Sequence, residues 1–434
     1  MDKFIAEYKQ FLDDGKTERE CVREILALAE KKGYRNIAGF SSLKPGDKVY
    51  VNKMDKSVAL FCIGRKDLAE GMHILGAHID SPRLDVKQNP VYEKDGIVYL
   101  NTHYYGGIKK YQWLTLPLAI HGEVFLTDGT SVSLSIGEKP DDPVFSISDI
   151  LPHIAQEQMK KSAADFIDAE NLDLVLGAFA GKDTGKKVVL EVLKRDYGIE
   201  EEDFQSAELE IVPAGAARDS GFCRDLILAY GQDDRVCAFA SLKAMLDIEN
   251  PEMTASCILV DKEEIGSYGA TGMRSHFYDN AVAEVVARTS SPSELTVRRC
   301  LANSWMLSSD VNSAFDPLNA DLYDKQNSSG LAQGVVFNKY TGGKGKSGSS
   351  DANPEFIAKL RKVMSDGKVT YQFAEMAKVD VGGGGTIAHM AATFGMQVID
   401  CGVPVLSMHA PWELTSKFDA YQAYLAYGAF FTLK

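Results

Sequence analysis

The chain has 434 residues and a formal net charge of −14, with 45% hydrophobic and 25% charged residues. That length exceeds what one ordinary hydrophobic core takes up, so we expect two domains. The composition is typical of a folded globular protein and argues against disorder. The acidic balance disfavours nucleic acids and anionic membranes as partners.

The sequence also indicates a location. The N-terminal stretch lacks the uninterrupted apolar segment of a secretory signal peptide, and no stretch reaches the roughly 18 uncharged residues of a membrane span. The seven cysteines are isolated in the sequence and form no CxxC pair. This pattern fits a protein of a reducing compartment and argues against a framework of disulfide bonds. We therefore expect a cytoplasmic protein with no membrane partner.

The predicted elements begin with two helices and continue with alternating strands and helices. Apolar residues at helical spacing predict a helix over 4–12, and a second helix is expected over 17–33. Thr17 and Glu20 match a capping box at the start of the second helix, and Gly33 would end it. Further on, short apolar runs predict buried strands at 72–77, 256–260, 305–307 and 403–407, and helical patterns appear at 234–248 and 354–364. This alternation predicts an α/β fold with a partly parallel sheet covered by helices.

The stretch from 89 to 221 has a different character. Runs rich in β-branched and aromatic residues, separated by turn residues, predict strands at 96–105, 114–126 and 131–136. Charged segments with helical character follow at 154–167 and 185–197. We predict that residues 89–221 form a separate β-rich domain, inserted into an α/β domain made of residues 1–88 and 222–434.

Potential metal ligands and acid/base groups gather where the predicted strands of the α/β domain end. Four runs end in such side chains: His78 and Asp80, then Asp261, Glu263 and Glu264, then Asp310, and finally His409. A polar turn places Asp233 and Asp234 just before a helix, where we expect Asp234 to cap the helix and Asp233 to bind metal. Because ligands bind at the carboxyl ends of strands in open α/β sheets, we expect these residues to converge.

The residue types indicate a catalytic metal site. A set of His, Asp and Glu without cysteine suits catalytic Zn²⁺, Mn²⁺ or Co²⁺ better than a structural zinc site. Two metals bridged by a carboxylate can activate water and polarise a carbonyl, and a spare carboxylate must then move the proton. The adjacent Glu263 and Glu264 can divide these tasks, because successive side chains point in different directions.

Several segments occur in the order and approximate spacing of the M18 metallo-aminopeptidases. They are GAHIDSPRL, GQDD, DKEEIGS, SSDV and VLSMH, accompanied by YGG, LPHI and a glycine run before TIAHM. The chain thus resembles the M18 (aspartyl aminopeptidase-like) family, in its bacterial-type branch, from about residue 4 to residue 413. The resemblance implies an α/β fold with a zinc-peptidase-like mixed sheet flanked by helices, and an inserted β-rich dimerisation domain.

The resemblance also implies a ligand set for two zinc ions per subunit, with Co²⁺ or Mn²⁺ as possible substitutes. His78 and Asp310 would hold one ion, and Glu264 and His409 the other. Asp233 would bridge both ions. By the same resemblance the substrates are peptides with a free N-terminus, and the subunits assemble into a dodecamer built from dimers.

Three more residues receive roles from the family pattern. Glu263 would be the general acid/base, and Asp80 would orient the imidazole of His78. His153, in the inserted domain, matches a family histidine that reaches a neighbouring subunit's active site. We assign it a substrate or oxyanion role, with metal binding as the alternative.

Some positions depart from the pattern of the acid-specific relatives. Ser313 stands where those relatives carry a substrate-contacting histidine, and Asp234 stands where they usually carry an asparagine. Lys339 lies near the position of a lysine that grips acidic side chains, but a longer glycine-rich segment follows it. The preferred N-terminal residue therefore stays open. Two alternatives remain: another two-metal amidohydrolase such as a deacylase, and a catalytically silent assembly protein that retains the metal site.

Overall fold

The computed structural model describes residues 1–180, 184–289 and 292–434, and its contacts divide the chain into two compact units. The first unit comprises Met1–Asp80, Ala217–Met408 and Glu413–Lys434, and the second comprises Ser81–Ala216 and His409–Trp412. The contacts therefore place the second unit slightly earlier in the chain than the predicted insertion at 89–221. They also add a short segment near the C-terminus that the sequence did not indicate.

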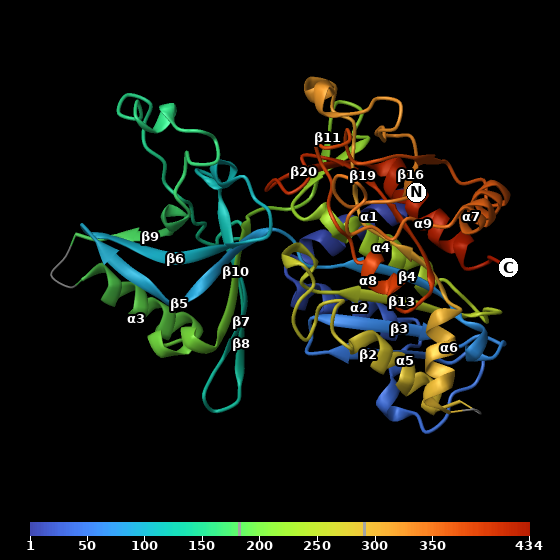
Figure 1. Ribbon diagram of the computed structural model, residues 1–434. Helices are drawn as coiled ribbons and strands as arrows, with labels where there is room; N and C mark the ends of the chain where they lie inside the picture. The colour runs from blue at the N-terminus through green and yellow to red at the C-terminus, as the bar shows by residue number, and fades with distance from the viewer. Residues whose placement is uncertain (181–183, 290–291) are drawn as a thin grey trace. The chain divides into compact units, whose positions relative to one another are not determined.

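A mixed sheet with helices on both faces forms the centre of the first unit (Figure 1). Strand β4 (Met72–His78) has parallel neighbours on both sides, β13 (Thr254–Val260) and β14 (Trp305–Ser308). Strand β14 pairs in parallel with β18 (Gln397–Gly402) on its other side. Strand β3 joins β13 in antiparallel fashion, and β16 does the same with β18. The mixed α/β class predicted from the sequence is thus confirmed. The order of the sheet is β1 (Arg35–Asn36), β2 (Lys48–Lys53), β3 (Ser57–Cys62), β13 (Thr254–Val260), β4 (Met72–His78), β14 (Trp305–Ser308), β18 (Gln397–Gly402), β16 (Val335–Asn338) and β17 (Tyr371–Phe373).

Alternate residues of the central strands enter two hydrophobic cores, one on each face of this sheet. In β4, Leu75 and Ala77 belong to one core, whereas Met72 and Ile74 belong to the other. This period of two is what a strand buried on both faces requires. The first core also takes residues from α1 (Asp2–Asp14), α2 (Glu18–Lys31), α4 (Gln232–Leu246), α7 (Pro354–Asp366) and α9 (Lys417–Phe430). The second core takes residues from α5 (Phe277–Ala287), α6 (Glu294–Ala302) and α8 (Ala388–Ala392).

A second sheet in the first unit contains the last of the predicted strands. Its order is β11 (Arg218–Ser220), β12 (Leu226–Ala229), β20 (Glu413–Ser416), β19 (Pro404–Leu406) and β15 (Asn312–Ser313). The apolar run predicted as a strand at 403–407 is therefore β19, and it lies outside the main sheet. The main sheet instead uses β18, which directly precedes it and which the sequence did not predict.

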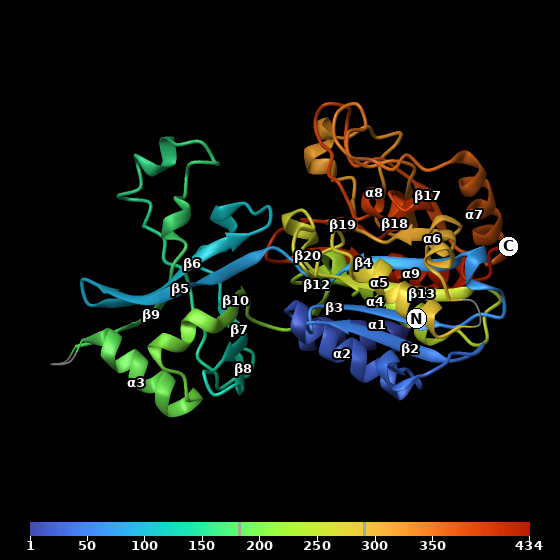
Figure 2. The same ribbon diagram turned by 60° about the horizontal axis from the view of Figure 1, so that its bottom comes forward.

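The second unit is built on an antiparallel sheet, shown in cyan and green in Figure 1. Every pair of neighbouring strands in it is antiparallel. Helix α3 (Gly185–Tyr197) contacts β5, β6 and β9, and it confirms the helix predicted over 185–197 (Figure 2). The order of the sheet is β8 (Ser131–Ile136), β7 (Leu118–Phe125), β10 (Ala207–Pro213), β5 (Arg83–Lys94), β6 (Ile97–Tyr105) and β9 (Leu174–Ala178).

One predicted helix of the second unit is wrong. Residues 154–167 form turns and one short 3₁₀ segment, Gln158–Lys160, instead of an α-helix. Ile154 and Met159, two apolar side chains of this segment, are 69% and 68% exposed. Because helices depend mainly on packing of an apolar face, helical propensity alone does not form one here. Within the described residues, no helix has both the length and the apolar character needed to cross a membrane.

Candidate metal centre

Three adjacent parallel strands of the first unit end at one edge of the sheet and bring three sequence segments together. In the register of the sheet, His78 at the end of β4 pairs with Val260 at the end of β13. On the other side of β4, Gly76 pairs with Ser308 at the end of β14. The residues that follow these strands, including Glu263 and Asp310, therefore emerge beside His78. This is the edge where α/β folds place their binding sites.

His78 lies almost fully buried at the centre of this group. Its Nδ1 is 3.0 Å from the carbonyl oxygen of Asp80 and 3.3 Å from Asp80 Oδ1. Its Nε2 is 3.3 Å from Asp233 Oδ1 and 3.9 Å from Glu263 Oε2. Burial disfavours the charged imidazole, but hydrogen bonds to Asp233 and Asp80 outweigh that effect and raise the pKa of His78 well above its usual value. In this arrangement Nδ1 faces Asp80 and Nε2 faces Asp233 and Glu263.

Asp233 is held at a kinked start of α4. The preceding Gly231 has a φ of 66°, and a Cβ there would lie 1.6 Å from the guanidinium of Arg235, so only glycine fits. The backbone N–H of Asp233 donates to Glu413 Oε2 at 3.0 Å. Glu413 is buried, and the sequence gave no local signal for this contact, because the two residues are 180 positions apart.

Asp234, which we predicted to cap the helix, lies at the kinked start of α4 and also contacts the end of β4. Its Oδ2 accepts the backbone N–H of His78 at 3.3 Å, and the N-cap position of α4 is Gly231. The side chain is fully buried, and burial raises the pKa of its carboxyl well above the usual value. Asp234 thus joins α4 to the end of β4, directly behind the imidazole of His78.

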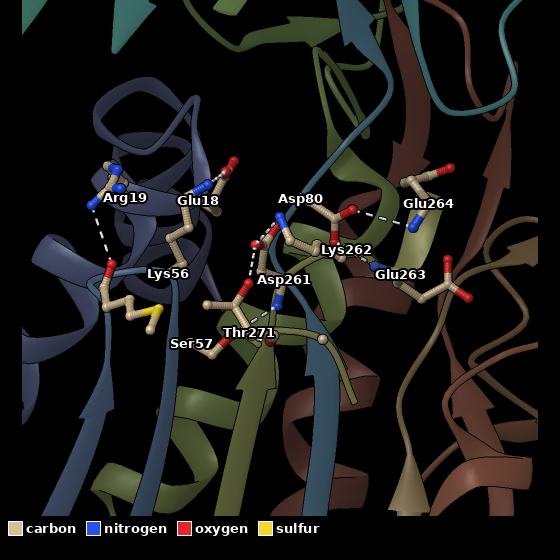
Figure 3. A network of polar contacts seen from close by, with 12 residues as sticks. Glu18, Arg19, Lys56, Ser57, Asp80, Asp261, Lys262, Glu263, Glu264 and Thr271 are labelled. Carbon is tan, nitrogen blue, oxygen red and sulfur yellow. Dashed lines mark hydrogen bonds and ion pairs between the residues drawn. The ribbon is translucent and has the colours of Figure 1, made fainter. Parts of the chain in front are cut away.

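The two glutamates lie on a tight turn that Asp80 holds from one side (Figure 3). Lys262, with a φ of 70°, directs the chain into this turn, and Glu263 and Glu264 begin a short 3₁₀ segment, Glu263–Ile265. Asp80 Oδ1 accepts the backbone N–H of Glu263 at 3.1 Å, and Oδ2 accepts that of Glu264 at 3.2 Å. Because both backbone N–H groups are held by Asp80, the two carboxylates point away from it.

The five converging side chains form two groups that suit metal ions. One group is His78, Glu263 and Asp310, and the other is His78, Asp233 and Glu264; within each group the ligand atoms lie within 4.8 Å of one another. Burial, followed by the charge of Asp234, raises the pKa of Asp310 well above its usual value. Several carboxylates gathered this closely repel one another, and divalent cations relieve that repulsion. The donor set, imidazole and carboxylate without thiolate, fits zinc at a catalytic site.

Four of the predicted site residues are not members of these two groups. His409 belongs to the second unit, where its Nδ1 is 2.9 Å from the carbonyl oxygen of Gly107. His153 lies in an exposed turn of the same unit. In the first unit, Lys339 Nζ pairs with Asp351 Oδ1 at 2.9 Å, and Ser313 Oγ is 3.1 Å from Tyr323 Oη. The roles assigned to these four residues stay predictions.

Comparison with known proteins identifies the family. The model of the M18 family, described as aminopeptidase I zinc metalloprotease, matches residues 11–431. The chain belongs to the M18 family. It is therefore related throughout to metallo-exopeptidases, and the resemblance inferred from the sequence is confirmed. This result favours aminopeptidase chemistry over the deacylase alternative.

The M18 relatives include closely similar bacterial proteins. A curated protein of Clostridium acetobutylicum, named "Probable M18 family aminopeptidase 1", is 54% identical over 98% of this chain and 93% of its own length. The crystal structure of an M18 aminopeptidase from Thermotoga maritima is 42% identical, covers 100% of this chain and 96% of its own, and has a TM-score of 0.95. The mApe1 dodecamer of S. cerevisiae shares the fold, with a TM-score of 0.79 and 20% identity over 98% of this chain and 95% of its own.

Proposed function

We propose that this M18 protein is a co-catalytic dizinc aminopeptidase that hydrolyses the first peptide bond of peptides with a free N-terminus. The observation that carries the proposal is the meeting of His78, Asp233, Glu264 and Asp310 at one sheet edge, with Glu263 beside them. His78 and Asp310 would hold one zinc ion and Glu264 and His409 the other, with Asp233 between them. Bound zinc at such a site polarises the scissile carbonyl and lowers the pKa of water.

Glu263 is the residue that we assign to proton transfer. Its Oε2 lies 3.9 Å from His78 Nε2, and its side chain keeps 15% of its surface exposed. It can therefore reach a water molecule while its backbone is held by Asp80. In the proposed reaction, a Glu263 carboxylate oxygen takes the proton of the attacking water and returns it to the leaving nitrogen. By the family pattern, His153 of a neighbouring subunit would support the oxyanion.

The experiment compares the same substitution at two neighbouring glutamates. Glu263→Gln should lower kcat by about three orders of magnitude or more while bound zinc persists, because only proton transfer is removed. Glu264→Gln should lower the zinc content as well, because it removes a ligand. Near-full activity of the Glu263→Gln protein would contradict the proposal.

The substrate class is tested separately from the role of Glu263. A panel of aminoacyl anilides covering all N-terminal residues should be hydrolysed, whereas N-acyl amino acids should not. Hydrolysis of the N-acyl compounds alone would favour a deacylase. An absence of any hydrolysis at saturating Zn²⁺, Co²⁺ and Mn²⁺ would favour a silent assembly protein. The panel also gives the preferred N-terminal residue of the substrate. Lys339 and Ser313 are the residues predicted to contact it.

We further propose that the protein is a cytoplasmic homo-oligomer, with the β-rich unit as its dimerisation domain. Support comes from the fold that the chain shares with the mApe1 dodecamer of S. cerevisiae. Light scattering of the purified protein tests the assembly. A mass of one subunit at micromolar concentration would contradict it.

A further inference from the structure

A closed ring of hydrogen bonds lies just behind the turn that carries Glu263 and Glu264 (Figure 3). The backbone N–H of Asp261 donates to Ser57 Oγ at 3.1 Å, and Ser57 Oγ donates to the carbonyl oxygen of Thr271 at 2.6 Å. Thr271 Oγ1 closes the ring by donating to Asp261 Oδ2 at 2.6 Å. We call these three residues the Ser57–Asp261–Thr271 ring. All three are buried.

The ring joins the two ends of the segment that carries the glutamates. Asp261 directly precedes this segment and Thr271 follows it, while Ser57 belongs to the neighbouring strand β3. Asp261 Oδ2 also pairs with Lys262 Nζ at 3.0 Å, so one carboxylate contacts both the first residue of the segment and its far end. The two ends of the segment are therefore held together.

Between these ends the backbone forms a compact turn. The carbonyl oxygen of Lys262 accepts the N–H of Ser267 at 2.7 Å, and that of Glu263 accepts the N–H of Gly266 at 2.8 Å. Asp80 holds the N–H groups of Glu263 and Glu264 from the other side. A shift of Thr271 or Asp261 would thus move a rigid turn as a body and redirect the side chain of Glu263.

Stability alone does not account for the carboxylate in this ring. Asp261 is fully buried, and burial, with the nearby Glu18 and Asp80, raises the pKa of its carboxyl to about 6. Replacing buried charged groups by apolar residues of similar volume is often neutral or stabilising. A hydrogen-bonded ring, in contrast, fixes the geometry of its members.

We propose that the Ser57–Asp261–Thr271 ring is a positioning device for the general base, and that Asp261 and Thr271 are positioning residues that act through the turn on Glu263. The inference rests on the proposed role of Glu263. It assigns a function to residues that touch neither substrate nor metal. Its physical basis is that the rate of proton transfer depends on the placement of the base to within about 1 Å.

The test uses a matched pair of substitutions at Thr271. Thr271→Val keeps the volume but removes the hydroxyl that binds Asp261, whereas Thr271→Ser keeps the hydroxyl. Steady-state kinetics at saturating zinc should show kcat about 10- to 100-fold lower for Thr271→Val, with KM changed less than about twofold. Thr271→Ser should retain most of kcat. Bound zinc per folded molecule should match that of the unsubstituted protein. The urea midpoint should fall, because the buried Asp261 loses a hydrogen-bond donor, so kcat is compared per folded molecule.

A second comparison keeps the proposal testable if Thr271→Val does not fold. Ser57→Ala removes one oxygen atom from the same ring and should also lower kcat at unchanged KM. Asp261→Ala combined with Thr271→Val should lose no more kcat than Asp261→Ala alone, because both break one unit.

The outcomes separate this inference from the proposed function. If Thr271→Val and Ser57→Ala keep full kcat while Glu263→Gln is inactive, the positioning role is wrong and the role of Glu263 stands. If Thr271→Val loses activity only in proportion to lost zinc or lost folded protein, the ring is structural and the inference is also wrong. An active Glu263→Gln protein would overturn both proposals.

Discussion

The carboxylate of Asp80 accepts the backbone N–H of Glu263, with 3.1 Å between Asp80 Oδ1 and the amide nitrogen. The other oxygen of the same carboxylate accepts the N–H of Glu264 at 3.2 Å, and Oδ1 also lies 3.3 Å from His78 Nδ1. One side chain therefore orients the proposed general base and two proposed ligands. We expected Asp80 to orient His78, and the structure adds that it also holds the turn of the glutamates.

Replacing Asp80 should consequently affect chemistry and metal binding together. Asp80→Ala leaves two backbone N–H groups without their acceptor, and Nδ1 of the imidazole keeps only the backbone carbonyl oxygen of residue 80 as a partner. We expect kcat to fall by at least about 100-fold and the zinc affinity to fall about 10- to 100-fold. Kinetics and competition with a chelator would measure these effects. Asp279→Ala, which removes a carboxylate paired with the exposed His276, serves as the control and should change neither quantity.

Asp310 should lower the free energy of unfolding when no cation neutralises its carboxylate. Its pKa is raised by burial and by the charge of Asp234, so the ionised carboxylate destabilises the folded state at pH values above the unfolded pKa of about 4. Asp310→Asn should therefore raise the free energy of unfolding of the chelator-treated protein at pH 7 by about 1 to 2 kcal/mol. Urea titrations with and without zinc would measure it.

Addition of zinc should stabilise the unsubstituted protein more than the Asp310→Asn protein. The unsubstituted protein should gain stability on addition of zinc, because the ions bind the folded state only. Asp310→Asn should gain markedly less, because a ligand is missing. Asp321→Asn, at an exposed position, should behave as the unsubstituted protein in both conditions. An Asp310→Asn protein that is less stable than the parent without zinc would refute this account.

The sequence predicted those features that depend on neighbouring residues. The capping box at Thr17 and the polar residues that end the strands at His78 and Asp310 are local patterns, and the structure has them as expected. The ring residues Ser57 and Thr271 could not be found this way, because their contact spans 214 positions and neither carries a distinctive motif. The register of β3 against β13 pairs Val58 with Leu259 and so brings Ser57 close to Asp261, to which Thr271 is hydrogen-bonded.

The differences between prediction and structure have the same physical origin. The segment 154–167 has helical propensity, but no core packs against it, as the exposure of Ile154 shows. The run at 403–407 has the composition of a buried strand, and composition does not tell which sheet the strand joins. In both cases tertiary packing decided between local alternatives of similar energy.

The capping box of α2 gives a prediction about stability alone. Thr17 Oγ1 accepts the N–H of Glu20 at 3.2 Å, and Glu20 Oε2 accepts the N–H of Thr17 at 3.0 Å. Thr17→Ala should lower the free energy of unfolding by about 1 kcal/mol, measured by urea titration, while kcat stays unchanged. Thr17→Ser keeps the hydroxyl and should lose less than half of that amount. Equal losses for both variants would show that the methyl group, not the cap, is responsible.

His73, at the start of β4, should make stability depend on pH. Its ring is buried beside Trp305 and Phe430, and burial lowers its pKa to about 4, with a hydrogen bond from the ring to the backbone of Phe431 opposing part of the shift. Between pH 4 and about 6.5 the unfolded chain therefore binds more protons than the folded chain. The contribution of the neutral His73 to the free energy of unfolding is complete above pH 6.5 and is lost as the pH falls. The loss approaches about 3 kcal/mol at pH 4. In chelator-treated protein, His73→Phe should flatten the fall in unfolding free energy between pH 6.5 and 4 relative to the parent. His276→Phe, at an exposed histidine, should keep the slope of the parent protein. Equal slopes for all three proteins would show that His73 has the same pKa in the folded and unfolded states.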